Sequence, residues 1–346
     1  MNKRRAEGGF PPLLMDQVFD RSYRLIDDLI IGHKRYCFLL SALESSIIDI
    51  LDNDGPMESE LLLKKIGCNS KLGGLWIDAL GEIGILERTE TAIRVRSALS
   101  PYLVSDSPLY QGDSIRSSKE AAWCNGVNFL KREPDTPVKS EGRMTPEFLR
   151  IVAQHSMRGE LQDITKILSS MEEFRSARRL LDIGGGHGMY TISFCQQNPD
   201  LSAVIFDRPH ITPATSEMVE KFGMNDQIRV ISGDMNLDLP GYEYDIVYVS
   251  HIFYRKEDLS ILIPRIVQVL NKGGLIVSNH KFGDDWKKRE NDATSVLENK
   301  IIRDFHQMIP EPDYLEILKS AGLDRIETWK VPANTGFSTL HTALKL

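Results

Sequence analysis

Residues Leu180-Leu181-Asp182-Ile183-Gly184-Gly185-Gly186-His187-Gly188 decide the fold of this chain. An apolar run typical of a buried strand leads into an acidic residue and then into a turn with glycine at positions 184, 186 and 188. Glycine permits a positive backbone φ and leaves no Cβ in the way of a ligand. The stretch therefore predicts a strand followed by a turn that brings its backbone close to a ligand.

The spacing of the glycines separates two kinds of nucleotide site. A dinucleotide fingerprint G-x-G-x-x-G starting at Gly184 needs glycine at position 189, where this chain has Met189. The pattern D-x-G-x-G-x-G instead resembles the S-adenosylmethionine (SAM) loop of class I methyltransferases. The residues that this resemblance expects at the methionine end of SAM are Asp182, Gly184, Gly186 and Gly188. A glycine-rich turn without a ligand is the alternative.

The composition of the 346 residues is that of a globular protein, with 41% hydrophobic and 26% charged residues. This length allows two domains with separate cores. A net charge of -7 argues against a nucleic-acid partner, which favours a basic surface. No apolar run approaches the roughly 20 residues of a membrane span, and the basic N-terminus lacks the apolar segment of a signal peptide. We therefore expect a cytoplasmic protein without a nucleic-acid or membrane partner.

The four cysteines are scattered along the chain, at Cys37, Cys68, Cys124 and Cys195. None of them forms a C-x-x-C pair. This pattern indicates reduced thiols in a protein core rather than a disulfide framework or a zinc site.

Residues 1–105 are predicted to form a helical domain with a small β element. The expected elements are helices over Ser41–Leu51, Glu58–Ile66 and Ser70–Ile83, and strands over 84–88 and 92–95. This order is typical of a winged helix. The third helix carries Lys71 as its only basic residue, against Asp78 and Glu82, so it offers almost nothing to DNA phosphates. We interpret the domain as a packing or dimerisation module.

Residues 106–172 are predicted to be a helical linker, and residues 173–346 alternate strands with helices. The expected strands are Arg179–Ile183, Ala203–Phe206, Arg229–Ile231, Asp245–Ser250 and Leu275–Ser278, followed by an antiparallel hairpin over Ile326–Val331 and Ser338–Leu344. Such near-continuous apolar runs suit a parallel sheet covered on both faces. The predicted fold class is α/β, a doubly wound, mostly parallel seven-stranded sheet with its ligand at the carboxyl ends of the strands.

Acidic residues also follow the second and third strands of this predicted sheet. A carboxylate at Asp207 can accept hydrogen bonds from both ribose hydroxyls of a nucleoside. In Gly233-Asp234-Met235, the acid can meet an adenine amino group while the thioether covers the ring. Either acid alone could be a helix N-cap. Together, after a glycine-rich turn, they predict a nucleoside site.

With these residues the chain resembles the dimeric, SAM-dependent small-molecule O-methyltransferases that include the plant phenolic and hydroxyindole enzymes. The resemblance extends over nearly the whole chain and is carried by the segments 182–188, Phe206-Asp207-Arg208-Pro209-His210, 233–235 and, more weakly, Leu270-Asn271-Lys272-Gly273-Gly274. It implies a homodimer formed through the N-terminal module, SAM as methyl donor, and a small aromatic or conjugated acceptor. It also implies that His155 and Met157 face the substrate, in a pocket to which the linker contributes.

The chain departs from this family after the fourth strand. The family segment has approximately the sequence L-K-H-V-L-H-D-W, and its second histidine is the general base. Here residues 249–256 are V-S-H-I-F-Y-R-K, so Tyr254 stands at the position of the base and Ser250 replaces the lysine beside the cofactor. The acidic residue that the family places after the fifth strand is Asn279 here. Because tyrosine has an ordinary pKa of about 10 and is a poor base, Tyr254 is expected to orient the substrate or to line its pocket.

Three interpretations of this altered site stay open. His251 could replace the family's base, or it could be a core histidine that is hydrogen-bonded within the protein and has no catalytic role. His251 and His306, with or without His280, could bind a metal that acidifies the substrate. Alternatively, the acceptor is an enolate carbon, an amine or an acidic hydroxyl and needs no strong base.

From these alternatives we select catalytic roles for His251 and Tyr254, a substrate contact for His306, and no metal. O-methylation is expected, with C- or N-methylation as the alternative. A SAM-binding regulatory protein that has lost catalysis is a further alternative. His187, inside the glycine-rich turn, is expected to be exposed beside the cofactor.

Overall fold

A computed structural model describes residues 23–68, 70–120, 144–252, 256–282, 309–333 and 336–346. The chain divides into two compact units, Met1–Tyr110 and Gln111–Leu346. The expected boundary after residue 105 lies close to this division. Within the described ranges, no helix has the length and apolar character needed to cross a lipid bilayer.

The first unit consists of helices and one short hairpin. Its elements are α1 (Arg24–Glu44), α2 (Ile47–Asn53), α3 (Ser59–Lys65), α4 (Ser70–Glu82), β1 (Leu86–Arg88), β2 (Ile93–Val95) and α5 (Ser100–Leu103). The two strands pair antiparallel, with Leu86 opposite Val95. The single helix expected over 41–51 is wrong, because Ser46 takes a left-handed φ of 57° and divides α1 from α2.

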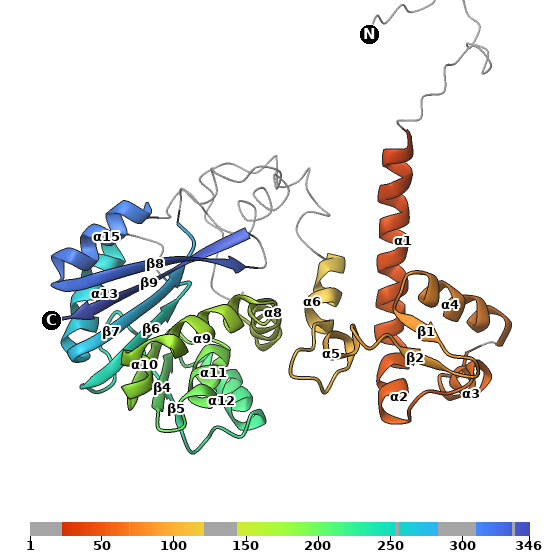
Figure 1. Cartoon of the computed structure of the whole chain (residues 1–346), viewed down its shortest axis with the longest axis horizontal. Coiled ribbons are helices and arrows are strands. Elements are labelled where there is room, and N and C mark those ends of the chain that lie inside the picture. Colours follow the sequence, from red (N-terminus) through yellow and green to blue (C-terminus); the bar gives the residue numbers. More distant parts are fainter. Residues whose placement is uncertain (1–22, 69, 121–143, 253–255, 283–308, 334–335) are drawn as a thin grey trace, which may run out of the picture. The chain divides into compact units, whose positions relative to one another are not determined.

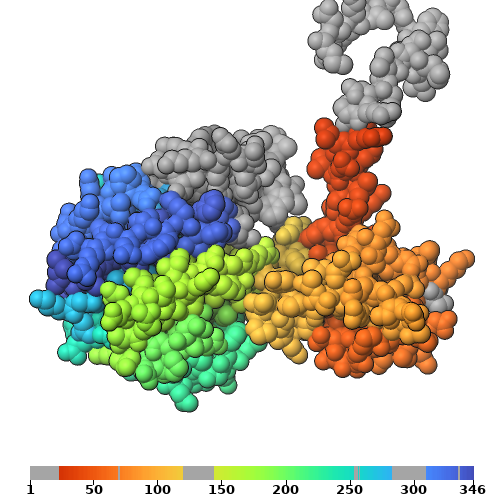
Figure 2. Space-filling model, in the orientation of Figure 1, coloured from red at the N-terminus to blue at the C-terminus, as the bar shows by residue number. Residues whose placement is uncertain are grey.

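The first turns of α1 have no neighbours among the described residues of this unit, as Figure 2 shows. Its apolar side chains there are exposed, including Leu25 (71%), Leu29 (76%) and Ile30 (45%). Cys37 on the same helix and Cys68 are exposed as well, so the expectation of core thiols is wrong for both. Cys195 is buried as expected, and Cys124 lies outside the described residues.

The second unit holds the predicted sheet (Figure 1). Its strands are β3 (Arg179–Ile183), β4 (Ser202–Asp207), β5 (Ile228–Ser232), β6 (Tyr244–Ser250), β7 (Leu270–His280), β8 (Leu323–Ala333) and β9 (Gly336–Lys345). Their order is β5-β4-β3-β6-β7-β9-β8, and only the pairs β7–β9 and β8–β9 are antiparallel. The prediction of a doubly wound, mostly parallel seven-stranded sheet is confirmed.

Helices cover both faces of this sheet. The described helices of the unit are α6 (Gly112–Ser117), the short η3 (Ser118–Glu120), α8 (Pro146–Ser156), α9 (Glu160–Ser170), α10 (Glu172–Ser176), α11 (Met189–Gln197), α12 (Thr212–Lys221), α13 (Lys256–Val269) and α15 (Glu311–Ser320). Alternate strand residues point to opposite faces. Leu180 therefore packs with the core formed by α9 to α12, whereas Leu181 packs with the core formed by α13 and α15. The inner strands β3 and β6 are apolar on both sides because both of their sides are buried.

Candidate active site

The glycine-rich turn joins the carboxyl end of β3 to the start of α11. Gly184, Gly186 and Gly188 have φ values of 69°, 52° and 74°, which L-residues with a Cβ rarely adopt. A Cβ on Gly185 would lie 2.6 Å from both Asp182 Oδ2 and Ile205 Cγ2. A side chain is therefore excluded at Gly185 by packing and disfavoured at Gly184, Gly186 and Gly188 by backbone conformation, so the turn presents backbone, as the sequence predicts.

Asp207 reaches this turn from the end of β4. Its Oδ2 accepts a hydrogen bond from the Gly186 amide at 2.8 Å, and its Oδ1 accepts one from the Arg208 amide at 2.7 Å. Burial raises the pKa of this carboxyl, and the two amide donors oppose the rise. The carboxylate thus lies at the carboxyl edge of the sheet beside the glycines, where the sequence places a ribose ligand.

Asp182 lies beneath the turn and is almost completely buried. Burial raises its pKa to about 7, against the hydrogen bond that Thr191 Oγ1 donates to Oδ2 at 2.6 Å; the negative charge of Asp207 adds to the rise. Its other oxygen, Oδ1, is buried and has no hydrogen-bond partner in the described part of the chain. An unsatisfied buried carboxyl oxygen suits a ligand with a cationic or hydrogen-bond-donating group, and SAM carries both an ammonium and a sulfonium.

The segment after β5 occupies the same edge. Asp234 is exposed, and its Oδ1 accepts hydrogen bonds from the backbone and side-chain nitrogens of Asn236 at 2.9 and 3.0 Å. Met235 is half-buried against the core under α13. A Cβ on Gly233 would collide with the ring of Phe206, which precedes Asp207. Gly233 therefore lets this segment lie close to β4, and the nucleoside residues predicted from the sequence share one edge.

His251 follows β6 and points at a buried carboxylate. Its Nε2 lies 3.3 Å from Glu160 Oε1, the first residue of α9. Asn279 on β7 donates from Nδ2 to the same Oε1 at 2.8 Å, and its carbonyl accepts the His251 backbone amide at 2.9 Å. The His251 backbone has a left-handed φ of 55°, which is uncommon for a residue with a side chain. Two strands and a helix therefore hold this imidazole in place.

Glu160 is a candidate functional residue that the sequence does not reveal. It is 6% exposed, and burial alone would raise its pKa. The hydrogen bond and positive charge of His251, with hydrogen bonds from Asn279 and Ser338, outweigh burial and hold the pKa of Glu160 at about 2, so the side chain is a carboxylate. An acid in the first turn of a helix is ordinarily a solvated residue that favours the helix dipole. No signal in the sequence distinguishes Glu160 from such a residue.

The two residues expected to face the substrate have protein partners. His155 Nε2 lies 2.7 Å from Ser114 Oγ of α6, and Arg158 donates to the same oxygen. Burial lowers the pKa of His155 to about 4, helped by the positive charges of Arg158 and Lys281, so the ring is neutral near pH 7. Met157 is partly buried against the core under α9 to α12.

His187 corrects one expectation, because it is buried and not exposed. Its Nδ1 accepts the Met189 amide at 3.1 Å, and its Nε2 lies 3.4 Å from Ser156 Oγ. Burial lowers its pKa to about 4. Neutral His187 therefore acts as an internal cap of the glycine-rich turn.

Other predicted site residues are placed only in part. Ser250 is the last residue of β6 and pairs with Asn279 of β7. Tyr254 and His306 lie outside the described residues. The ring centroids of His251 and His280 are 6.3 Å apart, and the described ranges contain no group of three or more His, Cys, Asp or Glu side chains that could hold a metal ion.

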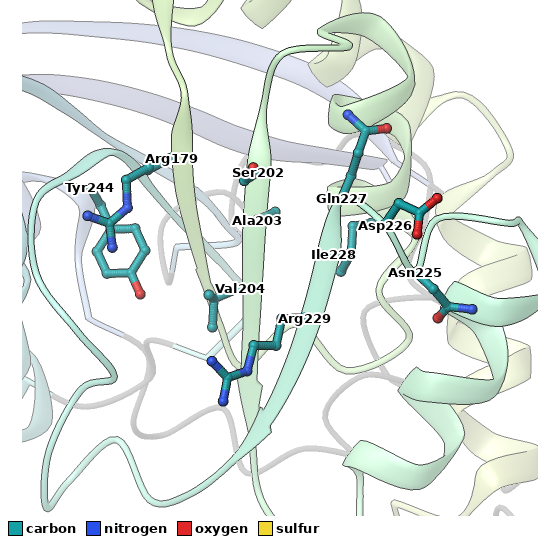
Figure 3. A pocket seen from close by; sticks show the side chains of 10 residues that line it. All are labelled: Arg179, Ser202, Ala203, Val204, Asn225, Asp226, Gln227, Ile228, Arg229 and Tyr244. Carbon is teal, nitrogen blue, oxygen red and sulfur yellow. The ribbon is translucent and has the colours of Figure 1, made fainter.

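A hollow lies at the opposite edge of the sheet from the glycine-rich turn (Figure 3). It lies at the amino ends of β3, β4, β5 and β6 and is lined by Arg179, Ser202, Ala203, Val204, Asn225, Asp226, Gln227, Ile228, Arg229 and Tyr244. The guanidinium of Arg179 lies 5.1 Å from the centroid of the Tyr244 ring. Ligands of doubly wound sheets bind at the carboxyl ends, so this hollow is not the expected site.

Known proteins are similar to this chain in sequence and in fold. The profile of the O-methyltransferase domain matches residues 140–324, which is more than half of the chain. A 3-hydroxy-5-methyl-1-naphthoate 3-O-methyltransferase from Streptomyces sahachiroi is 22% identical over 88% of this chain and 90% of its own length. An L-tyrosine C(3)-methyltransferase from Streptomyces lavendulae is 20% identical over 74% of each chain.

The fold is also that of human N-acetylserotonin methyltransferase, solved in complex with SAM. This structure matches with a TM-score of 0.70 and 19% identity, over 95% of this chain and 99% of the human one. The domain match, the similar enzymes and the solved structure point to the same family. The chain therefore belongs to the O-methyltransferase family, and it is a methyltransferase that uses S-adenosylmethionine.

Proposed function

We propose that this protein transfers a methyl group from SAM to a hydroxyl group of a small aromatic molecule. The observation that carries the proposal is the pairing of His251 with Glu160 at the edge of the sheet that also holds the glycine-rich turn and Asp207. The naphthoate enzyme of Streptomyces sahachiroi, which methylates such a hydroxyl, matches nearly the whole chain and supports this choice.

The residues around the glycine-rich turn are proposed to hold SAM. The methionine end would lie against Gly184, Gly186 and Gly188 with Asp182 beneath, the ribose against Asp207, and the adenine against Asp234 and Met235, with Ser250 nearby. When bound, SAM supplies an electrophilic methyl group on a sulfonium, and methyl transfer is an in-line displacement. The protein aligns the acceptor, excludes water and takes up the acceptor's proton.

His251 is proposed to take up that proton. A phenolic hydroxyl has an ordinary pKa of about 10 and is largely neutral at pH 7. Removal of its proton by a correctly positioned base therefore assists attack of the oxygen on the methyl group. The Nε2 of His251 faces a carboxylate, and no described residue is hydrogen-bonded to its Nδ1. Nδ1 is therefore the nitrogen assigned to the acceptor proton. Tyr254, His306, His155 and Met157 are proposed to orient the acceptor.

C-methylation is the second candidate reaction. The L-tyrosine C(3)-methyltransferase relative carries out this chemistry, in which a ring carbon attacks. Loss of a phenolic proton also activates the ring carbon next to it, so the same base serves both reactions. Product analysis separates the two, because a C-methylated phenol keeps its ionisable hydroxyl.

The first unit is proposed to join two copies of the chain. We propose residues 1–105 as a winged-helix dimerisation domain, 106–172 as a linker that contributes to the substrate pocket, and 173–346 as the SAM domain. The exposed apolar side chains of α1, such as Leu25 and Leu29, support a homodimer because a contiguous apolar surface favours a partner. The free thiols Cys37, Cys68 and Cys195 support a reducing, cytoplasmic location.

The proposal is tested by incubating the protein with methyl-labelled SAM and a panel of naphthols, phenols, aromatic amines and keto acids. We expect label to be transferred to phenolic oxygen, and transfer to fall by at least about 100-fold in His251→Ala. SAM binding without transfer to any acceptor would contradict catalysis and favour the regulatory alternative. Full activity of His251→Ala would exclude His251 as the base.

A further inference from the structure

We infer that Glu160 is a positioning residue that fixes the tautomer and orientation of His251, so that the Nδ1 of His251 presents a lone pair to the acceptor. The inference rests on the proposed function and adds to it a residue outside the sequence motifs. Glu160 is argued to act through His251 and not to touch the acceptor.

The first step is the protonation of the pair. Glu160 is an ionised carboxylate and can only accept hydrogen bonds. Its Oε1 lies 3.3 Å from His251 Nε2, so this contact is favourable only when Nε2 carries the proton. A neutral imidazole has one proton, and Nδ1 is then the acceptor nitrogen.

The second step is the role of Asn279. Its Nδ2 lies 2.8 Å from Glu160 Oε1 and 3.4 Å from His251 Nε2. The amide group therefore donates to Glu160, and the protonated Nε2 of His251 approaches the same oxygen from a second direction. Because Oε1 collects both donors, the carboxylate and not the amide determines which ring nitrogen is protonated.

The third step is burial. The Glu160 side chain is 8% exposed, whereas the His251 side chain is 27% exposed. The carboxylate is thus on the protein side of the imidazole, and the ring keeps an accessible side. A buried acid behind a partly accessible histidine stabilises the imidazolium that forms when the ring takes a proton, and the acid itself stays ionised.

The direct test of the tautomer is ¹⁵N NMR of the full-length protein labelled at histidine nitrogen. We expect the neutral ring of His251, assigned by its loss in His251→Ala, to show a protonated Nε2 and an unprotonated Nδ1. A neutral ring protonated at Nδ1 would overturn the inference. This readout requires neither a substrate nor a folded Glu160 variant.

The functional test compares Glu160→Gln with the wild type on two acceptors. For a weakly acidic naphthol we expect kcat to fall by about 10²- to 10⁴-fold with KM little changed, because the glutamine amide cannot stabilise an imidazolium. For a dinitrophenol, which is already ionised at mildly alkaline pH, the loss should nearly disappear because no proton has to be removed. Equal losses on both acceptors would assign Glu160 a structural role and overturn the inference.

The chain offers a matched control in a second acid–histidine pair. Glu311 Oε1 lies 3.0 Å from His341 Nε2, and hydrogen bonds from His341 and Lys330 outweigh burial and hold the pKa of Glu311 at about 2. Glu311→Gln is expected to leave both reactions unchanged.

The SAM affinity and melting temperature of Glu160→Gln show whether this variant is folded. Absence of methylation by the wild type would refute the proposed function, while the tautomer measurement would still decide the inference.

Discussion

Ionisation of the buried Asp182 carboxyl should make the second unit less stable as the pH rises through the neutral range. The carboxyl is 1% exposed, and burial raises its pKa from 3.8 to about 7. Between these two values the folded state keeps a proton that the unfolded state has lost. The stabilising contribution of the protonated Asp182 is therefore fully present below about pH 4. It declines as the pH rises and is lost once the pH exceeds about 7.

The size of this effect follows from the pKa difference. A difference of about 3 pKa units at about 1.4 kcal/mol each gives about 4 kcal/mol of lost stability between about pH 4 and pH 8. Asp182→Asn cannot ionise and retains an oxygen that can accept the hydrogen bond from Thr191. The free energy of unfolding of this variant, relative to the wild type, should therefore increase by about 4 kcal/mol over the same range.

The assay is urea unfolding at several pH values. Hydrogen exchange of the β3 amides is the readout, because these amides report on the second unit alone. Asp234→Asn, at an exposed position, controls for the loss of one negative charge. If the difference between Asp182→Asn and the wild type does not change with pH, the carboxyl is not held protonated by burial and the reasoning fails.

Three further perturbations test other parts of the structure. Gly185→Ala places a Cβ within 2.6 Å of Asp182 Oδ2 and should lower stability by about 1–3 kcal/mol and weaken SAM binding. Gly74→Ala, where nothing lies near the added Cβ, should have neither effect. Thermal melts and SAM titration of the two variants measure these effects. Phe194→Ala removes a fully buried ring whose centroid lies 5.0 Å from that of Tyr248 and should cost about 3–5 kcal/mol in urea unfolding, a value refuted by a loss under about 1 kcal/mol. Leu29→Asp should shift the sedimentation equilibrium from dimer to monomer without changing the melting of the second unit, and an unchanged dimer would exclude this part of α1 from the interface.

The parallel part of the sheet was predictable because its inner strands β3 and β6 are buried on both faces. Each strand from β3 to β6 is a short, nearly continuous apolar run, and the predicted ranges differ from the observed ones by at most one residue at either end. The positions of Asp207 and of Gly233-Asp234-Met235 then followed from parallel topology, since the carboxyl ends of parallel strands share one edge.

The acid–histidine pair was not predictable because it depends on tertiary packing. Glu160 is 91 residues from His251 and 119 residues from Asn279 along the chain. Only the packing of α9 on the sheet brings the three side chains together. The burial of His187 was missed for a related reason, because its partners Met189 and Ser156 lie on two different helices. The division between α1 and α2 depends on the left-handed backbone of Ser46, which local propensity does not indicate.

Calorimetric titration of SAM into the wild type and Asp207→Ala tests the central claim, that SAM binds at the carboxyl edge of the sheet, most directly. We expect the wild type to bind SAM and Asp207→Ala to bind it about 10- to 100-fold more weakly, because the loss of one charge-assisted hydrogen bond costs about 1.5–3 kcal/mol. Asp226→Ala, in the hollow at the opposite edge, should bind like the wild type. No binding by the wild type, or equal affinity of Asp207→Ala and the wild type, would contradict the claim.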